Sequence, residues 1–360
     1  MCSEVKNVKV LHIGEVAGLG GLQNWVCSVA EAQAKRGYEV ELMQPPWVSV
    51  DSQVFTHLPV HTWDLGRARN FNIVHTHGVS GFQNRRIQRI TPMPIVHTYY
   101  GTIVGIQIAL RWFQNFVGWN GLGVPRNIMR EAAGGRAANA VIANSPKVRS
   151  EIKRYYRISE KKISVIPGGY SRDQDDTSKA SLRRALGLPE SGFLFLFVGR
   201  ADPVKNFSSA LAAYHSTRSR FPNSYLVLAP NQNLPPTDGV IAVELAPQKM
   251  SQLYRSVDAL IHPGFYEAYS LAVHEALANG LPVVVGRNTG NADYCLSRVN
   301  ALVLPRKRGL DLVHSLSQMM CSLVESDHLR LSLGREAARK FGTMDWDWVA
   351  AETESVYSSL

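Results

Sequence analysis

The sequence predicts an α/β protein built from two doubly wound parallel-sheet domains that face a shared cleft. Three observations lead to this prediction. The chain has 360 residues, which suits two domains of ordinary size. Short apolar runs alternate with stretches of helical periodicity in both halves, a pattern typical of parallel sheets covered on both faces. A polar segment at 171–181, without apolar periodicity, separates the halves and is predicted to be a linker.

The first domain, predicted over residues 1–170, begins with the apolar run VKVLHIG and a Gly-rich loop. After that loop, apolar residues recur at helical spacing from Trp25 to Ala34, and Gly37 ends the pattern. Ser145 follows the run AVIAN, where we expect it to cap a helix rather than to act as a nucleophile. The predicted strands cover residues 8–14, 38–43, 71–78, 94–101, 140–145 and 162–169.

The second domain, predicted over residues 182–343, repeats this alternation of strands and helices. The apolar run FLFLFVGR reads as a buried strand, and helical periodicity follows from about Ser208. Another helix is predicted over 270–279, where Ser270 can cap the first turn and Gly280 can end the last one. The predicted strands cover residues 193–200, 224–230, 240–247, 259–264 and 282–287.

Cysteine usage and hydropathy place the chain in a reducing compartment. The four cysteines are widely spaced and form no CxxC pair, which argues against a disulfide scaffold and against a zinc site. The N-terminus carries no apolar leader, and no run reaches the roughly 18 apolar residues that span a bilayer. We therefore expect a cytoplasmic protein, at most peripheral on the cytoplasmic face of a membrane.

The positive charge of the chain lies entirely in its first half. Residues 1–170 hold 20 Lys and Arg against 10 Asp and Glu, whereas residues 171–360 hold 19 of each sign. One interpretation is that this charge only keeps the protein soluble. The other is that the first domain faces an anionic partner, such as a phosphorylated acceptor or an anionic lipid surface. Nucleic acid is not among the predicted partners.

Ligands of doubly wound sheets bind at the carboxyl ends of the strands, so functional residues are expected in the loops there. The first such loop is GLGGLQ, from Gly18 to Gln23, where glycines let backbone N–H groups approach a phosphate. A dinucleotide-binding fingerprint requires glycine at the position of Gln23. A dehydrogenase, with Glu39 or Glu41 as its ribose-binding acid, and a turn without ligand both stay open as alternatives.

A second loop, GRADPVKN, follows the first strand of the second domain. Arg200 and Lys205 flank a proline-containing turn there, and two cations at the carboxyl end of a strand suit a diphosphate. The alternative is a pair of solvated surface cations.

The third site is the segment HPGFYEAYSLAVHEALANG, in which Glu267 precedes a helix and Glu275 lies within it. The helix start offers free N–H groups and the positive end of the helix dipole to an anion. A carboxylate can accept hydrogen bonds from two neighbouring hydroxyls of a sugar or ribose. The two carboxylates could therefore bind polyol groups while backbone and cations bind phosphate. The alternative is one carboxylate paired with an arginine and the other solvated.

These motifs, in this order, resemble the retaining glycosyltransferases of family 4, and the resemblance covers nearly the whole chain. GGLQNWVCSVAEAQAKRGYEVEL resembles the family's Gly-Gly loop and helix, NIVHTHG its strand ending in histidine, and FVGRADPVKNF its phosphate-binding segment. FYEAYSLAVHEALANGLPVVV resembles its E-x7-E signature. The resemblance implies the GT-B fold, with two Rossmann-like domains and a C-terminal helix, 344–360, that crosses back to the first.

The resemblance also implies roles for individual residues in a retaining hexosyltransferase. It implies no metal and no cofactor beyond the nucleoside-diphosphate sugar, with a UDP-sugar as first choice, and a hydroxyl of a glycan, a lipid-linked molecule or a small molecule as acceptor. The implied catalytic residues are Glu267, Arg200 and Lys205. The implied donor site comprises Gly20 and Gly21 beside the diphosphate, Arg200 and Lys205 on it, Glu267 on the sugar, Glu275 on the ribose, and the amides of Ala268, Tyr269, Ser270 and Leu271.

The sequence departs from the family at Tyr100, where the family often has a histidine near the donor sugar. Tyr100 could donate a hydrogen bond there, or His97 could take the place of that histidine, and His77 is expected to line the cleft. These three residues are the predicted substrate contacts, whereas His75 is expected to be packed. His75 and His77 share one side of a strand, but a metal site needs a third ligand, and the sequence shows none.

Aromatic residues in segment 111–130, including Trp112 and Trp119, suit either a buried helix or a segment that docks on a membrane or holds a lipid-linked acceptor. The departure at Tyr100 keeps a catalytically inactive nucleotide-binding scaffold as an alternative to the enzyme. Intact Glu267, Glu275, Arg200 and Lys205 argue against that alternative.

Overall fold

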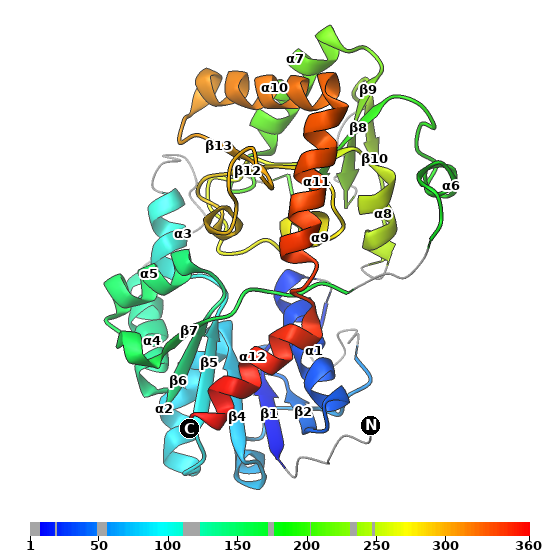
Figure 1. Ribbon diagram of the computed structural model, residues 1–360. Helices are drawn as coiled ribbons and strands as arrows, with labels where there is room; N and C mark the ends of the chain where they lie inside the picture. The colour runs from blue at the N-terminus through cyan, green and yellow to red at the C-terminus, as the bar shows by residue number, and fades with distance from the viewer. Residues whose placement is uncertain are drawn as a thin grey trace. The chain divides into compact units, whose positions relative to one another are not determined.

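A computed structural model of the chain describes residues 8–18, 20–48, 56–110, 123–171, 176–201, 203–230, 236–246 and 249–360. It divides into two compact units, shown with their elements in Figure 1. Unit 1 comprises Met1–Gly169 together with Trp346–Leu360, and unit 2 comprises Tyr170–Asp345. Each unit is built around one parallel sheet, as the alternation of apolar runs and helical patterns predicts.

The sheet of unit 1 has the order β3-β2-β1-β4-β5-β6-β7, and all of its pairings are parallel. Six of these strands coincide with predicted ones, and the short β3 was not predicted because two residues leave no detectable period. The strands are β1 Lys9–Ile13, β2 Glu39–Met43, β3 Val60–His61, β4 Ile73–His77, β5 Ile95–Tyr99, β6 Ala140–Ala143 and β7 Ile163–Val165.

Helices cover both faces of this sheet. The predicted cap at Ser145 is confirmed, because its hydroxyl accepts a hydrogen bond of 3.2 Å from the backbone N–H of Val148. The helices are α1 Gly21–Lys35, α2 Asn84–Ile90, α3 Ile103–Leu110, α4 Gly123–Ala137, α5 Pro146–Tyr156 and α12 Trp346–Ser358, with the 3₁₀ turns η1 Leu65–Asn70, η2 Gly78–Gln83 and η4 Glu160–Lys162.

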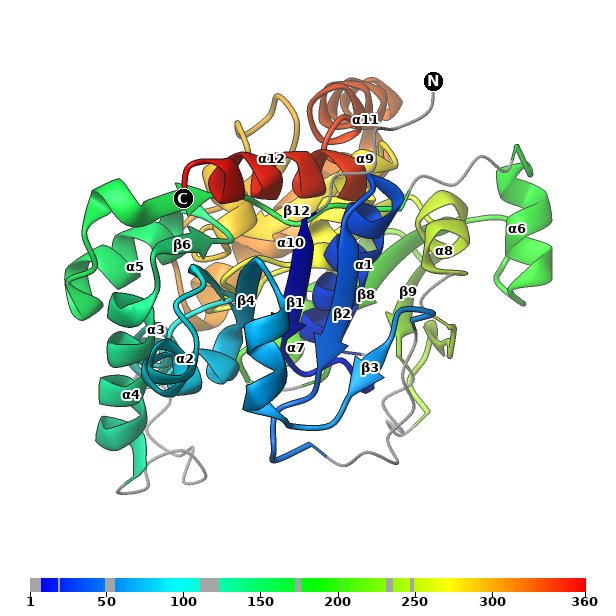
Figure 2. The ribbon, with the colours of Figure 1, turned by 90° about the horizontal axis from the view of Figure 1, so that it is seen from below.

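The last helix, α12, packs beside α1 within unit 1, as the views in Figures 1 and 2 both show. Arg36, at the end of α1, joins the two helices. Its guanidinium group donates hydrogen bonds of 2.7 Å to Glu354 and 3.0 Å to Asp347. The C-terminal segment therefore belongs to the fold of the first unit although it follows the whole of the second in sequence.

Strand register decides which side chains share a face of the unit 1 sheet. His12 on β1 pairs with His75 on β4, and His77 pairs with Thr98 on β5. Side chains of paired residues in a parallel sheet point to the same side, and residues two apart on a strand do so as well. These four side chains therefore lie on one face. His97 pairs with Thr76 and consequently lies on the opposite face.

The sheet of unit 2 has the order β10-β9-β8-β11-β12-β13, again entirely parallel. The five predicted strands are present, and the three-residue β13 was not predicted. The strands are β8 Phe193–Val198, β9 Ser224–Ala229, β10 Val240–Ala242, β11 Ala259–His262, β12 Val283–Gly286 and β13 Leu302–Leu304. The helices are α6 Lys179–Ala185, α7 Phe207–Arg220, α8 Met250–Ser256, α9 Leu271–Ala278, α10 Gly309–Glu325 and α11 Asp327–Phe341, with the 3₁₀ turn η6 Gly290–Asp293.

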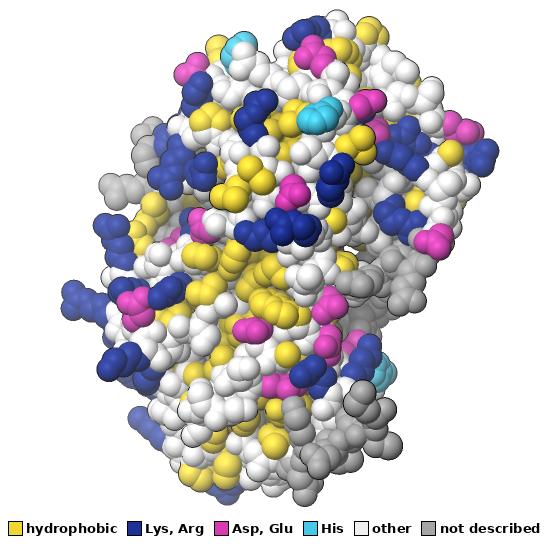
Figure 3. Space-filling model, viewed as in Figure 1, with side chains coloured by type: hydrophobic (Ala, Val, Ile, Leu, Met, Phe, Trp, Pro, Cys, Tyr) yellow, Lys and Arg dark blue, Asp and Glu magenta, His cyan; other side chains and the backbone are white. Residues whose placement is uncertain are grey.

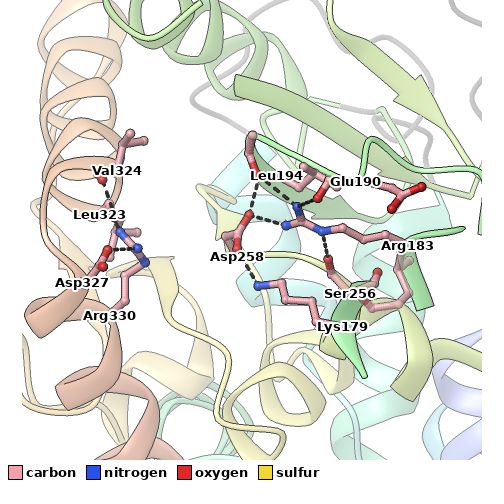
Figure 4. Close-up of polar contacts among 12 residues, drawn as sticks. Lys179, Arg183, Glu190, Leu194, Ser256, Asp258, Leu323, Val324, Asp327 and Arg330 are labelled. Atoms are coloured by element: carbon pink, nitrogen blue, oxygen red, sulfur yellow. Dashed lines mark hydrogen bonds and ion pairs between the residues drawn. The ribbon is translucent and has the colours of Figure 1, made fainter. Parts of the chain in front are cut away.

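Helix α6 begins inside the segment that was predicted to be a linker, at Lys179 rather than after 181. Polar contacts fix it to the sheet through Asp258, directly before β11 (Figure 4). The carboxylate of Asp258 accepts hydrogen bonds of 2.7 Å from the Arg183 guanidinium and from the backbone N–H of Leu194, and it also pairs with Lys179. The prediction was wrong here because these tertiary contacts stabilise a helix whose sequence carries little apolar period.

Helices α9 and α11 approach each other at two glycines. A Cβ atom at Gly334 would lie 2.2 Å from the carbonyl oxygen of Gly280, so only glycine fits at this crossing. Gly280 itself has a φ of +72° and ends α9, which confirms its predicted position after the last turn. The crossing sets the position of α9, the helix that carries Glu275.

The described surface of unit 1 is rich in cations. Figure 3 shows Lys and Arg side chains spread along the edge formed by α4 and α5, and α4 exposes Arg126, Arg130 and Arg136. Among the described helices, none is long and apolar enough to cross a bilayer. Trp112 and Trp119 lie outside the described residues.

Candidate active site

The loops after β8 and β11 bring Lys205 and Glu267 together at the carboxyl edge of the unit 2 sheet. The ammonium group of Lys205 forms an ion pair with the carboxylate of Glu267, although the two residues are far apart in sequence. Gly199, directly after β8, has a φ of +130°, and a Cβ atom there would lie 3.4 Å from the Lys205 side chain. The glycine therefore allows the chain to turn beneath the lysine.

Hydrogen bonds hold these two loops together. The backbone N–H of Phe265 donates to the carbonyl of Val204 at 2.9 Å, and the Asn206 side-chain amide donates to the carbonyl of Pro263 at 3.2 Å. Asn206 adopts a φ of +57°, a conformation that asparagine tolerates better than most residues. Lys205 therefore lies between Val204 and Asn206, both of which are held by hydrogen bonds. Arg200 lies at the end of the same strand, and its side chain is exposed.

Glu267 is held in its ionised form. Its backbone N–H and carbonyl bridge to the segment after β12, where the N–H of Gly290 donates to the Glu267 carbonyl at 2.9 Å. Burial alone would raise the pKa of Glu267, but the charge of Lys205 and the ring of His262, 3.7 Å from the carboxylate, outweigh burial and lower that pKa to about 2. Glu267 is consequently a hydrogen-bond acceptor at neutral pH, with 19% of its side chain exposed.

Glu275 lies within α9, and its environment shifts its pKa in the opposite direction. Its carboxyl group accepts a hydrogen bond of 2.7 Å from the hydroxyl of Tyr254. Burial raises the pKa of Glu275 to about 7, and the bond from Tyr254 offsets this only in part. The two glutamates of the segment therefore differ in charge over much of the pH range below neutrality. Neither of them is paired with an arginine in the contacts that the structure describes.

The start of α9 has the predicted cap but offers fewer amides than expected. The hydroxyl of Ser270 accepts a hydrogen bond from the N–H of Val273 at 3.4 Å, which confirms the N-cap. The N–H of Ser270 itself donates to Asn291 at 2.7 Å, and the Asn291 side chain returns a bond of 3.0 Å to the Ser270 carbonyl. The prediction that the amides of Ala268, Tyr269, Ser270 and Leu271 all face a ligand therefore needs correction at Ser270, whose N–H is already bonded.

In unit 1 the Gly-rich loop forms the N-terminus of α1. Gly20 is the N-cap and Gly21 the first helical residue; both are exposed, and a Cβ atom at Gly21 would meet nothing within 4 Å. Tyr100, directly after β5, packs edge to face against Trp25 of α1, with ring centroids 5.0 Å apart. The structure thus brings the half-buried Tyr100 to the first turns of the glycine-capped helix.

The predicted substrate contacts His77 and His97 are both buried, and they lie on opposite faces of the sheet. His77 contacts Tyr100, whose hydroxyl lies 2.7 Å from Nδ1 of the histidine ring. His97 instead contacts the backbone carbonyl of Thr76 through Nδ1, and a Cβ atom at Gly81 would lie 2.3 Å from its ring. This placement gives no support to the expectation that His97 contacts a substrate or replaces Tyr100.

The structure also supplies a third histidine beside His75 and His77, so the premise used against a metal site was wrong. One ligand atom from each of His12, His75 and His77 lies within 4.8 Å of the others, and all three residues are buried. Hydrogen bonds already occupy their ring nitrogens, however: Gln33, Tyr357, Thr98 and Tyr100 are the partners outside the trio. The arrangement therefore suits neutral hydrogen-bonded imidazoles better than metal ligands.

Sequence reasoning missed several residues that shape these sites, namely His262, Tyr254, Asn291 and His12. The position of His262 at the carboxyl end of a predicted strand was a usable signal for the first. Tyr254, Asn291 and His12 reach their partners only through the tertiary fold, because each partner lies at least 21 residues away.

Two Rossmann-like parallel-sheet domains are the architecture of the GT-B class of glycosyltransferases. Comparison with protein families supports this class over nearly the whole chain. The sequence model of Glycosyltransferase Family 4 matches residues 19–174, and that of Glycosyl transferases group 1 matches residues 178–339. The chain belongs to glycosyltransferase family 4.

Individual relatives are distant but cover most of the chain. A D-inositol 3-phosphate glycosyltransferase of Corynebacterium glutamicum is 24% identical, over 80% of this chain and 72% of its own length. The sucrose-phosphate synthase of Thermosynechococcus elongatus superposes with a TM-score of 0.78 at 18% identity, covering 98% of this chain and 99% of that one. The Anabaena protein HepE, in complex with UDP and glucose, superposes with a TM-score of 0.79 at 15% identity, covering 98% and 100%. These structures share the fold with this chain.

Proposed function

We propose that this protein is a retaining, metal-independent glycosyltransferase that moves a sugar from a nucleoside-diphosphate sugar to a hydroxyl group. The Lys205–Glu267 ion pair at the edge of the unit 2 sheet is the observation on which the proposal rests. It places a cation for phosphate beside an ionised carboxylate for sugar hydroxyls. The favoured donor is a UDP-sugar, because the HepE structures contain UDP and UDP-glucose.

Each group in unit 2 has a separate task in this proposal. Lys205 and Arg200 bind the diphosphate, together with the positive end of α9. Glu267, which is ionised, accepts hydrogen bonds from the donor sugar, and Glu275 accepts them from the ribose. Binding would require Lys205 to share its charge between Glu267 and phosphate, so donor binding and the ion pair are coupled.

The proposed reaction is a front-face displacement without a covalent glycosyl-enzyme. The bond between the anomeric carbon and the diphosphate oxygen breaks while the acceptor oxygen bonds to the same face of that carbon. The proton of the acceptor hydroxyl passes to the departing phosphate oxygen. Arg200 and Lys205 stabilise the charge that builds on the leaving diphosphate, which is the task a metal ion performs in other enzymes.

The acceptor is proposed to be a glycan, a lipid-linked molecule or a small molecule, and an anionic one is favoured. Unit 1 exposes the glycine-capped start of α1, and the first half of the chain carries all of the net charge. The name of the Corynebacterium relative likewise indicates a phosphorylated acceptor. The same charge would let the protein lie on the cytoplasmic face of an anionic membrane.

Thermal-shift measurements with UDP, GDP, ADP and NADH, without divalent metal, test the proposal. A nucleotide at about 100 times its Kd should stabilise the protein by roughly 2.7 kcal/mol, which gives a clear rise in Tm. A rise with one nucleoside diphosphate would support the transferase and name its base. Donors of that base then identify the sugar, and the anomeric configuration of the product tests retention. A rise in Tm with NADH alone would contradict the proposal. So would the absence of a rise in Tm with any of the nucleotides.

A further inference from the structure

Seven polar side chains of unit 1 form one continuous series of hydrogen bonds. It starts at Tyr100, whose hydroxyl lies 2.7 Å from Nδ1 of His77. Nε2 of His77 lies 2.8 Å from Nδ1 of His12, and Nε2 of His12 lies 2.7 Å from the side-chain oxygen of Gln33 on α1. This half of the series connects the carboxyl edge of the sheet with the interior of the unit.

The second half leads through the C-terminal helix. The side-chain amide of Gln33 donates to the hydroxyl of Tyr357 on α12 at 3.2 Å. That hydroxyl lies 2.6 Å from Nδ1 of His75, and Nε2 of His75 lies 2.7 Å from the hydroxyl of Thr98. Residues 324 positions apart, Gln33 and Tyr357, are thus joined directly.

The histidines in this series are neutral. Burial lowers the pKa of His12 to about 4, and burial together with the neighbouring rings lowers the pKa of His75 and His77 well below the ordinary value. A neutral imidazole has one N–H donor and one acceptor nitrogen. A ring that accepts a hydrogen bond at one nitrogen must therefore donate one from the other. The donor and acceptor roles at any one bond consequently fix the roles at all the others.

The orientation of the Gln33 side-chain amide sets the direction of these hydrogen bonds in the structure. Its oxygen faces His12 and its amide nitrogen faces Tyr357. His12 must then carry its proton on Nε2, which leaves its Nδ1 to accept from Nε2–H of His77. His77 in turn accepts from the Tyr100 hydroxyl. In the other direction Tyr357, which accepts from Gln33, donates to His75, and His75 donates from Nε2 to Thr98.

We propose that this series acts as one directional hydrogen-bond chain that makes Tyr100 a hydrogen-bond acceptor toward its ligand, with Gln33 and Tyr357 as positioning residues. The hydroxyl proton of Tyr100 is committed to His77, so only its oxygen lone pairs are available outward. Ligand groups that donate, such as sugar hydroxyls, fit this arrangement. A ligand that needs a donor at this position would have to reverse all six bonds together.

This inference rests on the proposed function only in taking the ligand of Tyr100 to be a substrate. It differs from the contact at Tyr100 expected from sequence, which was a donated hydrogen bond. Tyr357 of α12 connects Gln33 with His75, and the described structure has no hydrogen bond directly between those two residues.

A metal ion shared by His12, His75 and His77 is the competing explanation. The rings of His75 and His77 are stacked at 26° with centroids 4.2 Å apart, and those of His12 and His77 at 17°. Ring nitrogen lone pairs lie in the ring planes, so two rings that lie face to face, as those of His75 and His77 do, do not direct them to a common point. The hydrogen-bonded pairing of His12 with His77 at 2.8 Å uses two of the nitrogens that a metal would need.

The tautomers of the histidines in the full-length protein, labelled with ¹⁵N, test the proposal by NMR. The proposed hydrogen-bond chain requires His12, His75 and His77 all to carry the proton on Nε2. Two other buried histidines provide internal references, because each faces a backbone carbonyl that can only accept. Nδ1 of His97 lies 3.1 Å from the Thr76 carbonyl and 3.0 Å from the Thr76 hydroxyl, and both oxygens can accept from it. His274 meets the Met344 carbonyl through Nε2 and the Tyr269 hydroxyl through Nδ1, so the two histidines should show opposite tautomers.

The variant Gln33→Glu tests whether the direction is transmitted. A carboxylate only accepts, so it would accept a hydrogen bond from the Tyr357 hydroxyl, whose oxygen could then only accept from His75. We expect His75 to switch from the Nε2–H to the Nδ1–H tautomer, while His12 and His77 stay unchanged. Adding Tyr357→Phe should abolish the switch. Gln88 lies on α2 and takes no part in the hydrogen-bond chain. Gln88→Glu therefore places the same charge in unit 1 and should change none of the three tautomers.

The outcomes separate this proposal from the proposed function. Three Nε2–H tautomers in the unaltered protein support the chain, and this measurement needs no variant to fold. Mixed tautomers would show that no single direction exists, and three Nδ1–H tautomers would make Tyr100 a donor; either result overturns the proposal. So would resonances characteristic of metal-bound imidazole. None of these results depends on catalytic activity, which the nucleotide and donor assays test independently.

Discussion

The carboxyl group of Glu275 should make unit 2 less stable as the pH rises, and Glu275→Gln should remove that dependence. Burial raises the pKa of Glu275 in the folded protein to about 7, against 4.5 for the ordinary carboxyl. The unfolded chain thus releases this proton at lower pH than the folded one. Its contribution to stability is complete below pH 4.5 and is lost as the pH rises to 7. Glutamine imitates the protonated carboxyl and can still accept from Tyr254.

The size of the effect follows from the two pKa values. The difference between 7 and 4.5, at about 1.36 kcal/mol per pKa unit, amounts to about 3 kcal/mol in the free energy of unfolding. Wild type and Glu275→Gln should therefore be about equally stable at pH 4. Near pH 8 the variant should be more stable than wild type by about 3 kcal/mol.

Urea denaturation at pH 4, 6 and 8, followed by far-UV circular dichroism, measures this difference. All 7 tryptophans lie in the segments that form unit 1, so tryptophan fluorescence follows unit 1 and should show no change specific to the variant. A stability difference between variant and wild type that stays constant from pH 4 to pH 8 would refute the reasoning. It would mean that Glu275 is solvated as an ordinary carboxyl.

The matched control is Glu267→Gln, for which the same argument gives the opposite sign. The pKa of Glu267 is lowered to about 2, so the folded state binds this proton less readily than the unfolded chain. Its contribution of about 3 kcal/mol is present above pH 4.5 and is lost as the pH falls toward 2. Glu267→Gln should therefore be less stable than wild type at pH 8, where Glu275→Gln is more stable.

Two further predictions concern turnover and packing. Lys205→Ala should lower kcat by roughly 100-fold or more, as expected for one lost group that stabilises the leaving diphosphate, measured by initial rates with the donor that the thermal shifts identify. Gly334→Ala should lower the stability of unit 2 by about 1–3 kcal/mol, because the added methyl group collides with the Gly280 carbonyl, and circular dichroism during urea denaturation measures it.

Each of these variants has a control. Lys205→Arg keeps the charge and should retain more activity than Lys205→Ala; unchanged turnover in Lys205→Ala would remove the residue from the site. Arg335→Ala alters the exposed neighbour of Gly334 on the same helix and should have little effect on stability. Equal stability of Gly334→Ala and wild type would mean that α11 can move away from α9 without cost.

Much of the fold could be predicted because its signal is local. A buried parallel strand appears as a short apolar run, and a helix that covers the sheet as a 3.6-residue period, wherever the partners lie. Eleven of the thirteen strands in the described part of the chain were found in this way, whereas β3 and β13, of two and three residues, are too short to show a period. The start of α6 was missed because contacts with Asp258 stabilise it.

The candidate site could be predicted as a set of positions but not as a set of chemical states. The order of the motifs placed Lys205, Glu267 and Glu275 at the carboxyl ends of strands or in the helix beside them. Their spacing could not show that Glu267 pairs with Lys205 while Glu275 is buried against Tyr254, which gives two carboxylates opposite pKa shifts. Solvation and nearby charge set those states, and both depend on the assembled fold.

The sequence by itself determined the two parallel-sheet domains, the family and the segments that carry the site, because periodicity and motif order lie within short stretches of chain. The resemblance to the family also placed the C-terminal helix on the first domain. Only the tertiary structure decided that Tyr357 of this helix meets Gln33, that His97 lies on the face opposite His77, and that Ser270 gives its N–H to Asn291. The physical reason is that register and hydrogen-bond pairing are set between segments distant in sequence, where no local pattern records them.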